Sequence, residues 1–391
     1  NSLYASDRAN YASSDGFVLV NPAGGANTSG PANNQFFTDR RAATISDGGT
    51  IAFASPTGAC GRDSLGRAFT CNYLFQSNGS LVAQTGTRVG LAPSGSSPSG
   101  SQFLGGNGNT GREGTLVQLY PQLDRYSANL IGHFEVSPAF VPCGDGCFLL
   151  TTAGGPGSSG PAFITGSTIG SGFGYSAPLA TYERPRLDNP FLSDQARNQI
   201  IASLVAGGTN PANITGATRF TLRRNLTDLG TRTESAQRDT FRIVGGVRGT
   251  LNSHLNYEVS ANYGQFVEHT KLDGVMNTQR FLLGMDAQRN AAGQIVCGSQ
   301  IDATRAGADL NGDAANLARD IAACVPINLF GNGNISQAAK DYLLRTTTSY
   351  GKITQLDIVG TVSGDTGGFF NLPGGPVGFS FGGEYRRETA R

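Results

Sequence analysis

The sequence predicts an all-β chain built from antiparallel hairpins, and three observations carry this prediction. Within residues 240–267, Phe241 and Ile243 alternate with Arg242, and the next run alternates in the same way. A period of two indicates a strand with one apolar and one polar face. Only residues 251–254 separate the two runs, as in an antiparallel hairpin. Glycine supplies 56 of 391 residues and charged residues only 15%, a composition typical of strands and loops rather than helices.

The two faces of this hairpin predict a boundary between lipid and water. Its polar face carries arginine, glutamate and asparagine, which a packed core does not accept without partners. Its other face carries tyrosine, phenylalanine and aliphatic residues. Such a strand pair is typical of a transmembrane antiparallel β-barrel. We expect the turn at Asn252 and Ser253 to face the periplasm, with Arg242, Arg248 and Glu258 toward the lumen and Phe241, Ile243, Tyr257 and Val259 toward lipid.

Alternating patterns predict about seven strands in all. Besides the hairpin, they cover residues 1–8, 125–135, 140–152, 353–363 and 377–386. The middle of the 140–152 strand is poor strand material, because it reads Pro-Cys-Gly-Asp-Gly-Cys. The charged residues on the predicted polar face either line a substrate path or simply form a hydrated inner surface. They are Arg125, Glu135, Arg242, Arg248, Glu258, Glu384 and Arg386.

The connections between these strands are unequal in length. Short ones alternate with long loops at about residues 9–121, 153–216 and 271–342. Outer-membrane barrels have short periplasmic turns and long extracellular loops, so we place recognition in the long loops. Two of these loops contain helix signals: Ser193 is a plausible N-cap for a helix over 194–205, and Asp313 for one over 314–323.

The six cysteines fall into three sequence-local pairs, which predict disulfides in an oxidising compartment. A zinc site is the competing interpretation, but it requires histidine near closely spaced cysteines. The only histidines are His133, His254 and His269, which we interpret as polar strand or turn residues. The disulfide candidates are Cys60 with Cys71, Cys143 with Cys147, and Cys297 with Cys324.

Several function classes find no support in the sequence. The net charge is +1 without a basic stripe, so no nucleic-acid partner is expected. There is no catalytic motif, so we expect neither an enzyme nor a cofactor. The Gly-rich run at 106–111 lacks the strand and helix of a dinucleotide site. Asp309, Asn311 and Asp313 are a weak calcium candidate, because Ala314 replaces the required glycine; otherwise we expect no metal site.

Five segments resemble TonB-dependent outer-membrane receptors of the large proteobacterial type: residues 189–193, 238–249, 256–264, 324–331 and 372–386. The resemblance implies uptake of a small-molecule substrate such as a siderophore or saccharide, driven by proton-motive force through the TonB complex. It also implies a Gram-negative outer-membrane location, lipid contact, and a plug domain inside a barrel of about 22 strands. We recognise no plug segment in this chain, so we expect a fragment with roughly a third of such a barrel. Alternatives are a passive porin, a β-barrel adhesin, or a soluble secreted binding protein stapled by disulfides.

Overall fold

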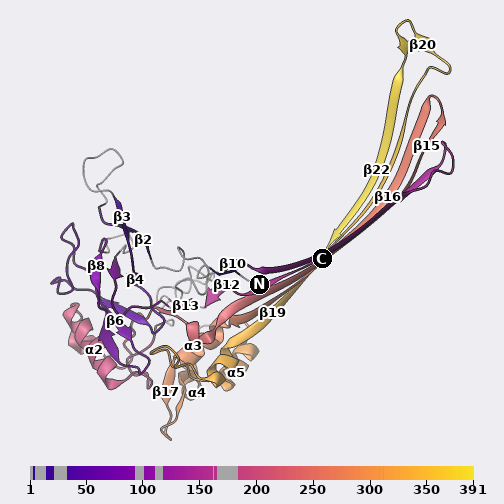
Figure 1. Cartoon of the computed structure of the whole chain (residues 1–391). Coiled ribbons are helices and arrows are strands. Elements are labelled where there is room, and N and C mark those ends of the chain that lie inside the picture. Colours follow the sequence, from indigo (N-terminus) through magenta and orange to yellow (C-terminus); the bar gives the residue numbers. More distant parts are fainter. Residues whose placement is uncertain are drawn as a thin grey trace.

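The chain is mainly antiparallel β structure, with strands in 49% and helices in 16% of its residues. The computed structural model describes residues 3–4, 15–21, 33–92, 101–110, 118–161, 163–164, 184–307, 309–310 and 312–391. Its largest sheet, the long sheet, has six strands and is not closed. Figure 1 shows these strands running together away from the helices. In sheet order they are β11 (Gln122–His133), β12 (Val141–Pro161), β15 (Thr231–Asn252), β16 (Leu255–Met276), β19 (Leu344–Asp365) and β22 (Gly378–Ala390).

Short links join neighbouring strands at one end of the long sheet, which we call the link end. The links are residues 134–140, 253–254 and 366–377. The last contains a small hairpin of β20 (Asn371–Leu372) and β21 (Gly375–Pro376). The predicted hairpin is confirmed as β15 and β16, with Arg248 opposite Glu258. The turn itself is Ser253 and His254, one residue later than predicted.

The strands extend further than the sequence predicts. Residues 153–216 and 271–342 were expected as loops, but β12 continues to Pro161 and β16 to Met276. Within the described residues the long sheet has six strands, whereas the sequence predicts about seven. In the predicted strand at residues 1–8, the described part is β1 (Leu3–Tyr4), which pairs with β10 (Gln118–Tyr120) outside the long sheet.

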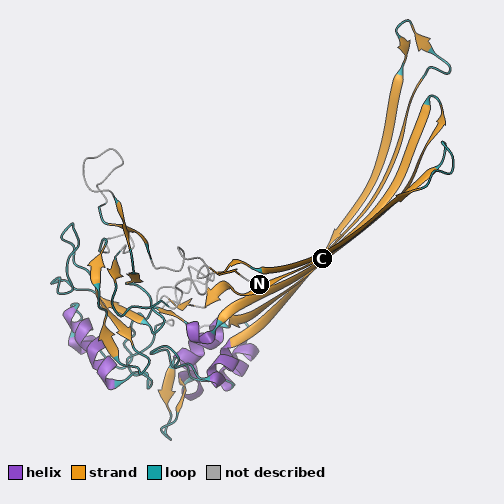
Figure 2. Ribbon diagram, in the orientation of Figure 1, coloured by secondary structure: helices purple, strands orange, loops and turns teal. Residues whose placement is uncertain are grey.

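The other end of the sheet meets a folded unit made from the segments that the sequence assigns to loops. We call it the braced unit; it comprises the described residues within 33–110, 184–230 and 277–343. Figure 2 shows that the helices gather there. The helical elements are α2 (Asp194–Ala206), η3 (Pro211–Asn213), η4 (Thr227–Leu229), α3 (Thr278–Met285), α4 (Gly298–Ile301), η5 (Ala303–Ala306), α5 (Ala314–Ala322) and α6 (Gln337–Leu343).

Short strand triplets and pairs complete the braced unit, and two of the pairs include one strand from outside its three segments. The two triplets are β5 (Thr50–Phe53) with β6 (Cys71–Phe75) and β7 (Leu81–Ala83), and β4 (Arg40–Ala42) with β9 (Gln102–Leu104) and β8 (Thr87–Val89). The pairs are β2 (Gly16–Leu19) with β3 (Asn34–Phe37), β13 (Phe163–Ile164) with β14 (Arg224–Asn225), and β17 (Ala287–Arg289) with β18 (Ile295–Cys297).

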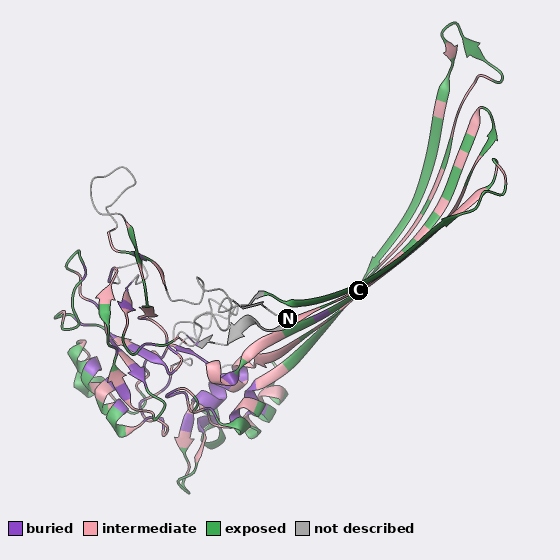
Figure 3. Ribbon diagram, in the orientation of Figure 1, coloured by how far each residue is buried: buried purple, intermediate pink, exposed green. Residues whose placement is uncertain are grey.

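A single hydrophobic core joins all three segments of the braced unit. Phe75, Leu222 and Phe330 are each at most 3% exposed, and the Phe75 and Phe330 ring centroids lie 5.0 Å apart. Hydrogen bonds also join segments that are distant in sequence. The Gln195 side-chain amide donates to the Leu81 carbonyl and accepts from the Leu81 backbone amide. Figure 3 shows buried residues concentrated here, whereas the long strands are mostly exposed or half-buried. These segments are therefore a packed body rather than independent loops.

Both helix signals are confirmed. The Ser193 hydroxyl accepts from the Ala196 amide, and the Asp313 carboxylate accepts from the Ala315 and Asn316 amides. Each side chain satisfies amide groups that have no partner within the helix. Among the described residues, no helix has both the length and the apolar character needed to cross a bilayer.

Two of the three expected disulfides are present. Cys60 bonds to Cys71 and Cys297 to Cys324, with Cα–Cα distances of 5.3 and 6.2 Å. Both lie in the braced unit, and each closes a local loop; Cys297 and Cys324 are part of its hydrophobic core.

The expected Cys143–Cys147 disulfide is wrong, since both thiols are free. The two residues lie on one continuous strand, β12, where residues four apart are separated by about 13 Å. A disulfide requires Cα atoms within about 7 Å. The weak strand propensity of this segment is overridden because it pairs with β11 on one side and β15 on the other.

Candidate functional site on the polar face of the long sheet

The register of the long sheet sorts its side chains onto two faces. Residues directly opposite each other in an antiparallel pair project from the same face. Arg248 lies opposite Glu258, which in turn lies opposite Thr361. On the next pair, Arg386 lies opposite Asp357. We call this side the polar face.

The structure places six of the seven charged candidates on the polar face. These are Arg125 on β11, Arg242 and Arg248 on β15, Glu258 on β16, and Glu384 and Arg386 on β22. Glu135 lies beyond β11, in the link over residues 134–140. Adjacent strands are about 4.8 Å apart, so Arg125 and Arg386, on opposite edges of the sheet, do not converge on one small ligand. The candidates form a charged surface rather than a single catalytic centre.

Neighbouring groups on this face neutralise one another locally. Arg386 forms an ion pair with Glu384 at 2.8 Å, and the Arg242 guanidinium donates to the Asn262 side-chain oxygen at 2.9 Å. Sequence reasoning missed a further pair, Arg238 with Glu268 at 3.0 Å. This pair could have been predicted, because the alternation of polar and apolar residues in β15 and β16 continues beyond residues 240–267.

The polar face is hollowed at the link end, where a cavity of about 290 Å³ lies over β15 and β16. Pro138, in the link over residues 134–140, borders this hollow. The link is held against the sheet because the Thr250 amide donates to the Pro138 carbonyl and the Tyr257 hydroxyl, from the opposite face, donates to the Ala139 carbonyl at 2.9 Å. One cation, one anion and several hydroxyl and amide groups therefore surround the hollow. Its polar lining is Arg248, Thr250, Asn256, Glu258, Thr361 and Ser363. Such a mixture suits a neutral or zwitterionic polar molecule better than a strongly charged one.

The opposite face carries a continuous apolar band over all six strands. Several of its large apolar side chains are mostly exposed: Leu130 is 79%, Ile243 61% and Phe381 72% exposed. The band consists of Tyr126, Leu130, Phe148, Leu150, Phe241, Ile243, Val247, Tyr257, Val259, Tyr263, Leu356, Ile358, Val362, Phe379, Phe381 and Tyr385. Soluble monomers rarely expose a contiguous apolar surface of this extent.

The apolar band covers only the half of the sheet nearer the link end. On β16 it runs from Leu255 to Tyr263, and beyond it His269 and Lys271 occupy the same face. At ~3.3 Å per residue the apolar stretch is about 30 Å long. A transmembrane strand tilted by ~45° needs about 9–11 residues. The nine residues from Leu255 to Tyr263 therefore match the shortest strand that crosses a bilayer at this tilt.

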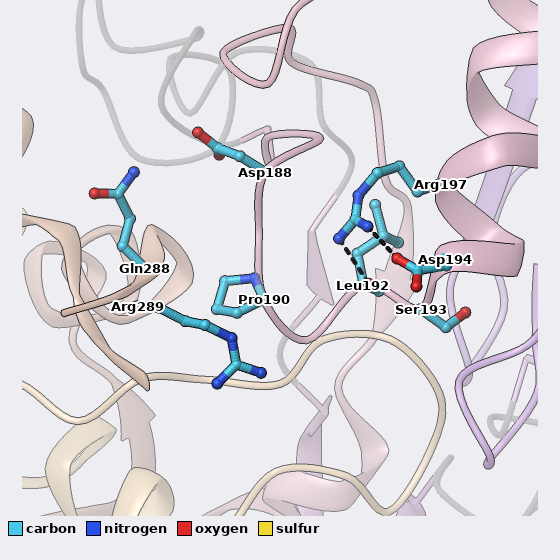
Figure 4. Close-up of a pocket in the computed structure, with 8 residues that line it drawn as sticks. All are labelled: Asp188, Pro190, Leu192, Ser193, Asp194, Arg197, Gln288 and Arg289. Atoms are coloured by element: carbon cyan, nitrogen blue, oxygen red, sulfur yellow. Dashed lines mark hydrogen bonds and ion pairs between the residues drawn. The ribbon is translucent and has the colours of Figure 1, made fainter. Parts of the chain in front are cut away.

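A second hollow, of about 520 Å³, lies in the braced unit (Figure 4). Its charged side chains already have partners within the protein. Arg197 pairs with Asp194 at 2.5 Å and donates to the Leu192 carbonyl, and Arg289 donates to the Gly293 carbonyl. Asp188 pairs with Arg186 at 2.7 Å. We interpret this hollow as a structural groove between α2 and β17, and we place the candidate site on the long sheet.

The most deeply buried charges in the braced unit also have structural roles. Arg224 is fully buried and pairs with Asp228 at 2.6 Å, while its Nε donates to the Asp47 carbonyl. Burial lowers the pKa of Arg224, and the nearby Asp228 carboxylate opposes that effect. A buried charge of this kind persists only because its partners replace water.

Arg88 is a second structural cation. Its guanidinium lies between the Phe69 and Phe103 rings, at 4.8 and 4.5 Å from their centroids. It donates to the Ser101 hydroxyl at 2.9 Å. Burial lowers the pKa of Arg88 to about 10, which leaves it charged at neutral pH. Arg88 joins β8 and β9 to the loop that ends in Cys71.

The weak calcium candidate lies partly outside the described residues, so it stays a prediction. Asp313 is occupied as the N-cap of α5, Asp309 lies in the preceding loop, and Asn311 lies outside the described residues. Among the described residues, no group of three or more histidine, cysteine, aspartate or glutamate side chains is arranged to hold a metal ion. Of the histidines, His254 pairs through Nδ1 with Asp365 at 2.7 Å, and His133 lies opposite Cys143.

Comparison of the chain with protein-family models, curated proteins and solved structures gives no match in any of the three.

Proposed function

We propose that the long sheet is part of a transmembrane β-barrel of a TonB-dependent outer-membrane receptor, which takes up a small polar nutrient. In this proposal the apolar band contacts lipid, and the polar face lines a water-filled or plug-filled lumen. The braced unit lies outside the cell and contributes to recognition. The link end faces the periplasm, and the TonB complex supplies the energy for uptake.

The apolar band is the observation that carries this proposal. Lipid allows irregular backbone only where protein or water covers it, so spanning sheets need continuous strand pairing through the hydrocarbon layer. The long sheet has such pairing across the whole band, including the Gly144–Gly146 stretch of β12. One face is apolar over the height of a bilayer and the other is charged, which is the alternation of a barrel that encloses water.

The family and the transport activity rest on the sequence resemblance together with this geometry. The hollow beside Arg248 and Glu258 has polar groups of both charges, which supports a polar small-molecule substrate over an apolar one. Two disulfides in the braced unit support an oxidising environment such as the cell exterior. The plug, the TonB contact and the remaining strands are expected in other parts of the receptor.

A pair of adjacent substitutions tests the lipid-facing assignment. Val259 lies in the middle of the apolar band, and its neighbour Ser260 projects from the polar face. Val259→Arg should weaken insertion of the chain into phospholipid vesicles by about 2–4 kcal/mol, the cost of an arginine at the bilayer midplane. Ser260→Arg, which adds the same charge, should change insertion little. Vesicle flotation and resistance of the long strands to protease are the measurements.

Equal effects of the two substitutions would contradict the assignment of faces. A chain that never floats with vesicles, in wild-type or variant form, would contradict the membrane proposal itself.

One observation favours a second candidate, a soluble secreted binding protein. The braced unit has its own hydrophobic core and both disulfides, as small secreted domains do. Cell fractionation separates the two candidates: the receptor partitions with the outer membrane, whereas the secreted protein appears in the periplasm or medium. The soluble candidate also requires a protein surface to cover the apolar band, and the barrel does not.

A further inference from the structure

The link between β19 and β22 presents a set of exposed apolar side chains beyond the end of the sheet. Phe369 is 83% exposed, Phe370 51% and Leu372 50%. No charged residue occurs from Thr366 to Val377. In Figure 1 this link, with β20, forms the tip of the molecule farthest from the braced unit.

The exposed apolar side chains belong to a turn whose backbone is held by hydrogen bonds. The amides of Phe369 and Phe370 both donate to the Thr366 carbonyl, and the Val377 amide donates to the Thr366 hydroxyl at 2.9 Å. At the base of the link, the Asp365 carboxylate accepts from the Gly367 amide at 2.8 Å and pairs with His254. The backbone therefore has internal partners while the aromatic side chains project from it.

The link is continuous with the apolar band. Phe379 follows it directly on β22 and lies on the band face, with its ring centroid 5.9 Å from that of Phe381. The link over residues 134–140, at the opposite edge of the sheet, also has exposed aromatic side chains, since Phe134 is 70% and Phe140 48% exposed. Apolar side chains thus extend past the strand ends in two separate links.

We propose that the 366–377 link is a membrane-interface anchor, which inserts Phe369, Phe370 and Leu372 into the bilayer leaflet at the link end. The inference rests on the proposed function, because it needs the band to be in lipid. Lipid is the occupant that fits best: protein interfaces surround an apolar centre with a polar, often charged rim, whereas this link lacks charge and continues the band. An ordinary periplasmic turn would instead be hydrated.

The absence of tryptophan from the chain allows a direct test. A single introduced tryptophan reports its own environment, so each variant is measured in vesicles of phosphatidylcholine brominated at defined acyl depths, which quench nearby indole fluorescence. The link probes are Phe369→Trp and Leu372→Trp. Phe381→Trp reports the band, and Phe36→Trp, on an exposed position of β3, is the water-exposed control.

The anchor predicts that both link probes lose fluorescence with bromines placed near the headgroups, more than with bromines at the bilayer centre. The band probe should be quenched as well, and the β3 probe should not. If the band probe is quenched but neither link probe is, the anchor is wrong and the proposed function stands; this is also the result if the link binds another protein or a second copy of the chain. If the band probe is not quenched, both are wrong.

Discussion

The braced unit and the long sheet contain the same kinds of residue, but they differ in how far those residues are exposed to solvent. In the braced unit, apolar side chains such as Phe281 and Leu283 are almost fully buried, whereas on the long sheet Ile243 and Phe381 are mostly exposed. Charged pairs differ in the same way. Arg224 and Asp228 are 0% and 5% exposed, but Arg386 and Glu384 are 53% and 48% exposed.

The difference shows where each region obtains its stability. The braced unit supplies its own core and covalent clamps, so its fold is determined by contacts within the chain. The long sheet has continuous backbone pairing, but no layer formed by the described residues covers either of its faces, so its apolar side requires an environment that this part of the chain does not provide. The comparison predicts that substitutions should have large effects inside the braced unit and small effects at matched exposed positions of the sheet.

The largest effect is expected from breaking the buried ion pair. Asp228→Asn leaves the Arg224 guanidinium buried without a full counter-charge, and such a loss costs about 3–5 kcal/mol. The matched change on the sheet, Glu384→Gln, removes an exposed pair whose contribution is about 0–1 kcal/mol. Hydrogen exchange of backbone amides in the braced unit, measured on the whole chain, should show the first change and not the second. If both substitutions reduced amide protection in the braced unit by similar amounts, the proposed difference between the two regions would be wrong.

The next effect concerns cysteines. Replacing Cys297 and Cys324 by serine opens a loop with a sequence separation of 27, which should lower the unfolding free energy of the braced unit by about 3.5 kcal/mol in the chain-entropy treatment. Replacing Cys143 and Cys147 by serine should have almost no effect, because no bond is lost.

Urea unfolding with and without reductant measures both cysteine variants. Reductant should destabilise the wild type and leave the Cys297/Cys324 variant less affected. If the Cys143/Cys147 variant lost as much stability as the other, those two thiols would be bonded in solution.

The comparison also explains which features can be predicted from sequence. The faces of the long strands follow from local alternation, so the pairing of β15 with β16 and the shared side of Arg242, Arg248 and Glu258 were predictable. The exact register was not, because the turn lies one residue later than the sequence predicts. The helix caps at Ser193 and Asp313 were predictable for the same reason, since each depends on a few neighbouring residues.

The braced unit was not predictable because its contacts are distant in sequence. The strands and helices of its segments are short, and they form one packed unit only through long-range contacts. One example is the hydrogen bond that the Asn332 side chain donates to the Asp47 carboxylate, 285 residues away in sequence. Strand β12 was misjudged for a related reason, because pairing on both edges outweighs the weak propensity of residues 142–147. The hollow on the polar face depends on the fold-back of the 134–140 link, for which the sequence contains no periodic signal.

The smallest of the three effects concerns Asp63, which lies in the loop closed by Cys60 and Cys71. Its side chain is fully buried and accepts hydrogen bonds from the Arg67 guanidinium at 2.8 Å and from the Leu65, Arg67 and Ala92 amides. Burial alone would raise the pKa of Asp63, but these hydrogen bonds favour the carboxylate and lower it below the ordinary value of 3.8. Asp63→Asn should therefore cost about 1–3 kcal/mol at neutral pH, the usual penalty for weakening buried hydrogen bonds to a charged group.

The sign of the pH dependence follows from the direction of the pKa shift. A carboxyl group whose pKa is lower in the folded state stabilises the fold above its ordinary pKa of 3.8, and this contribution is lost as the pH falls through the folded value. The difference between wild type and Asp63→Asn should thus be constant near neutrality and shrink below pH of about 4. Asp194→Asn, at a carboxylate that is 91% exposed, should change stability by less than about 1 kcal/mol. A wild-type advantage that grew on acidification would mean that Asp63 folds protonated, and the hydrogen-bond donors around it make that state unfavourable.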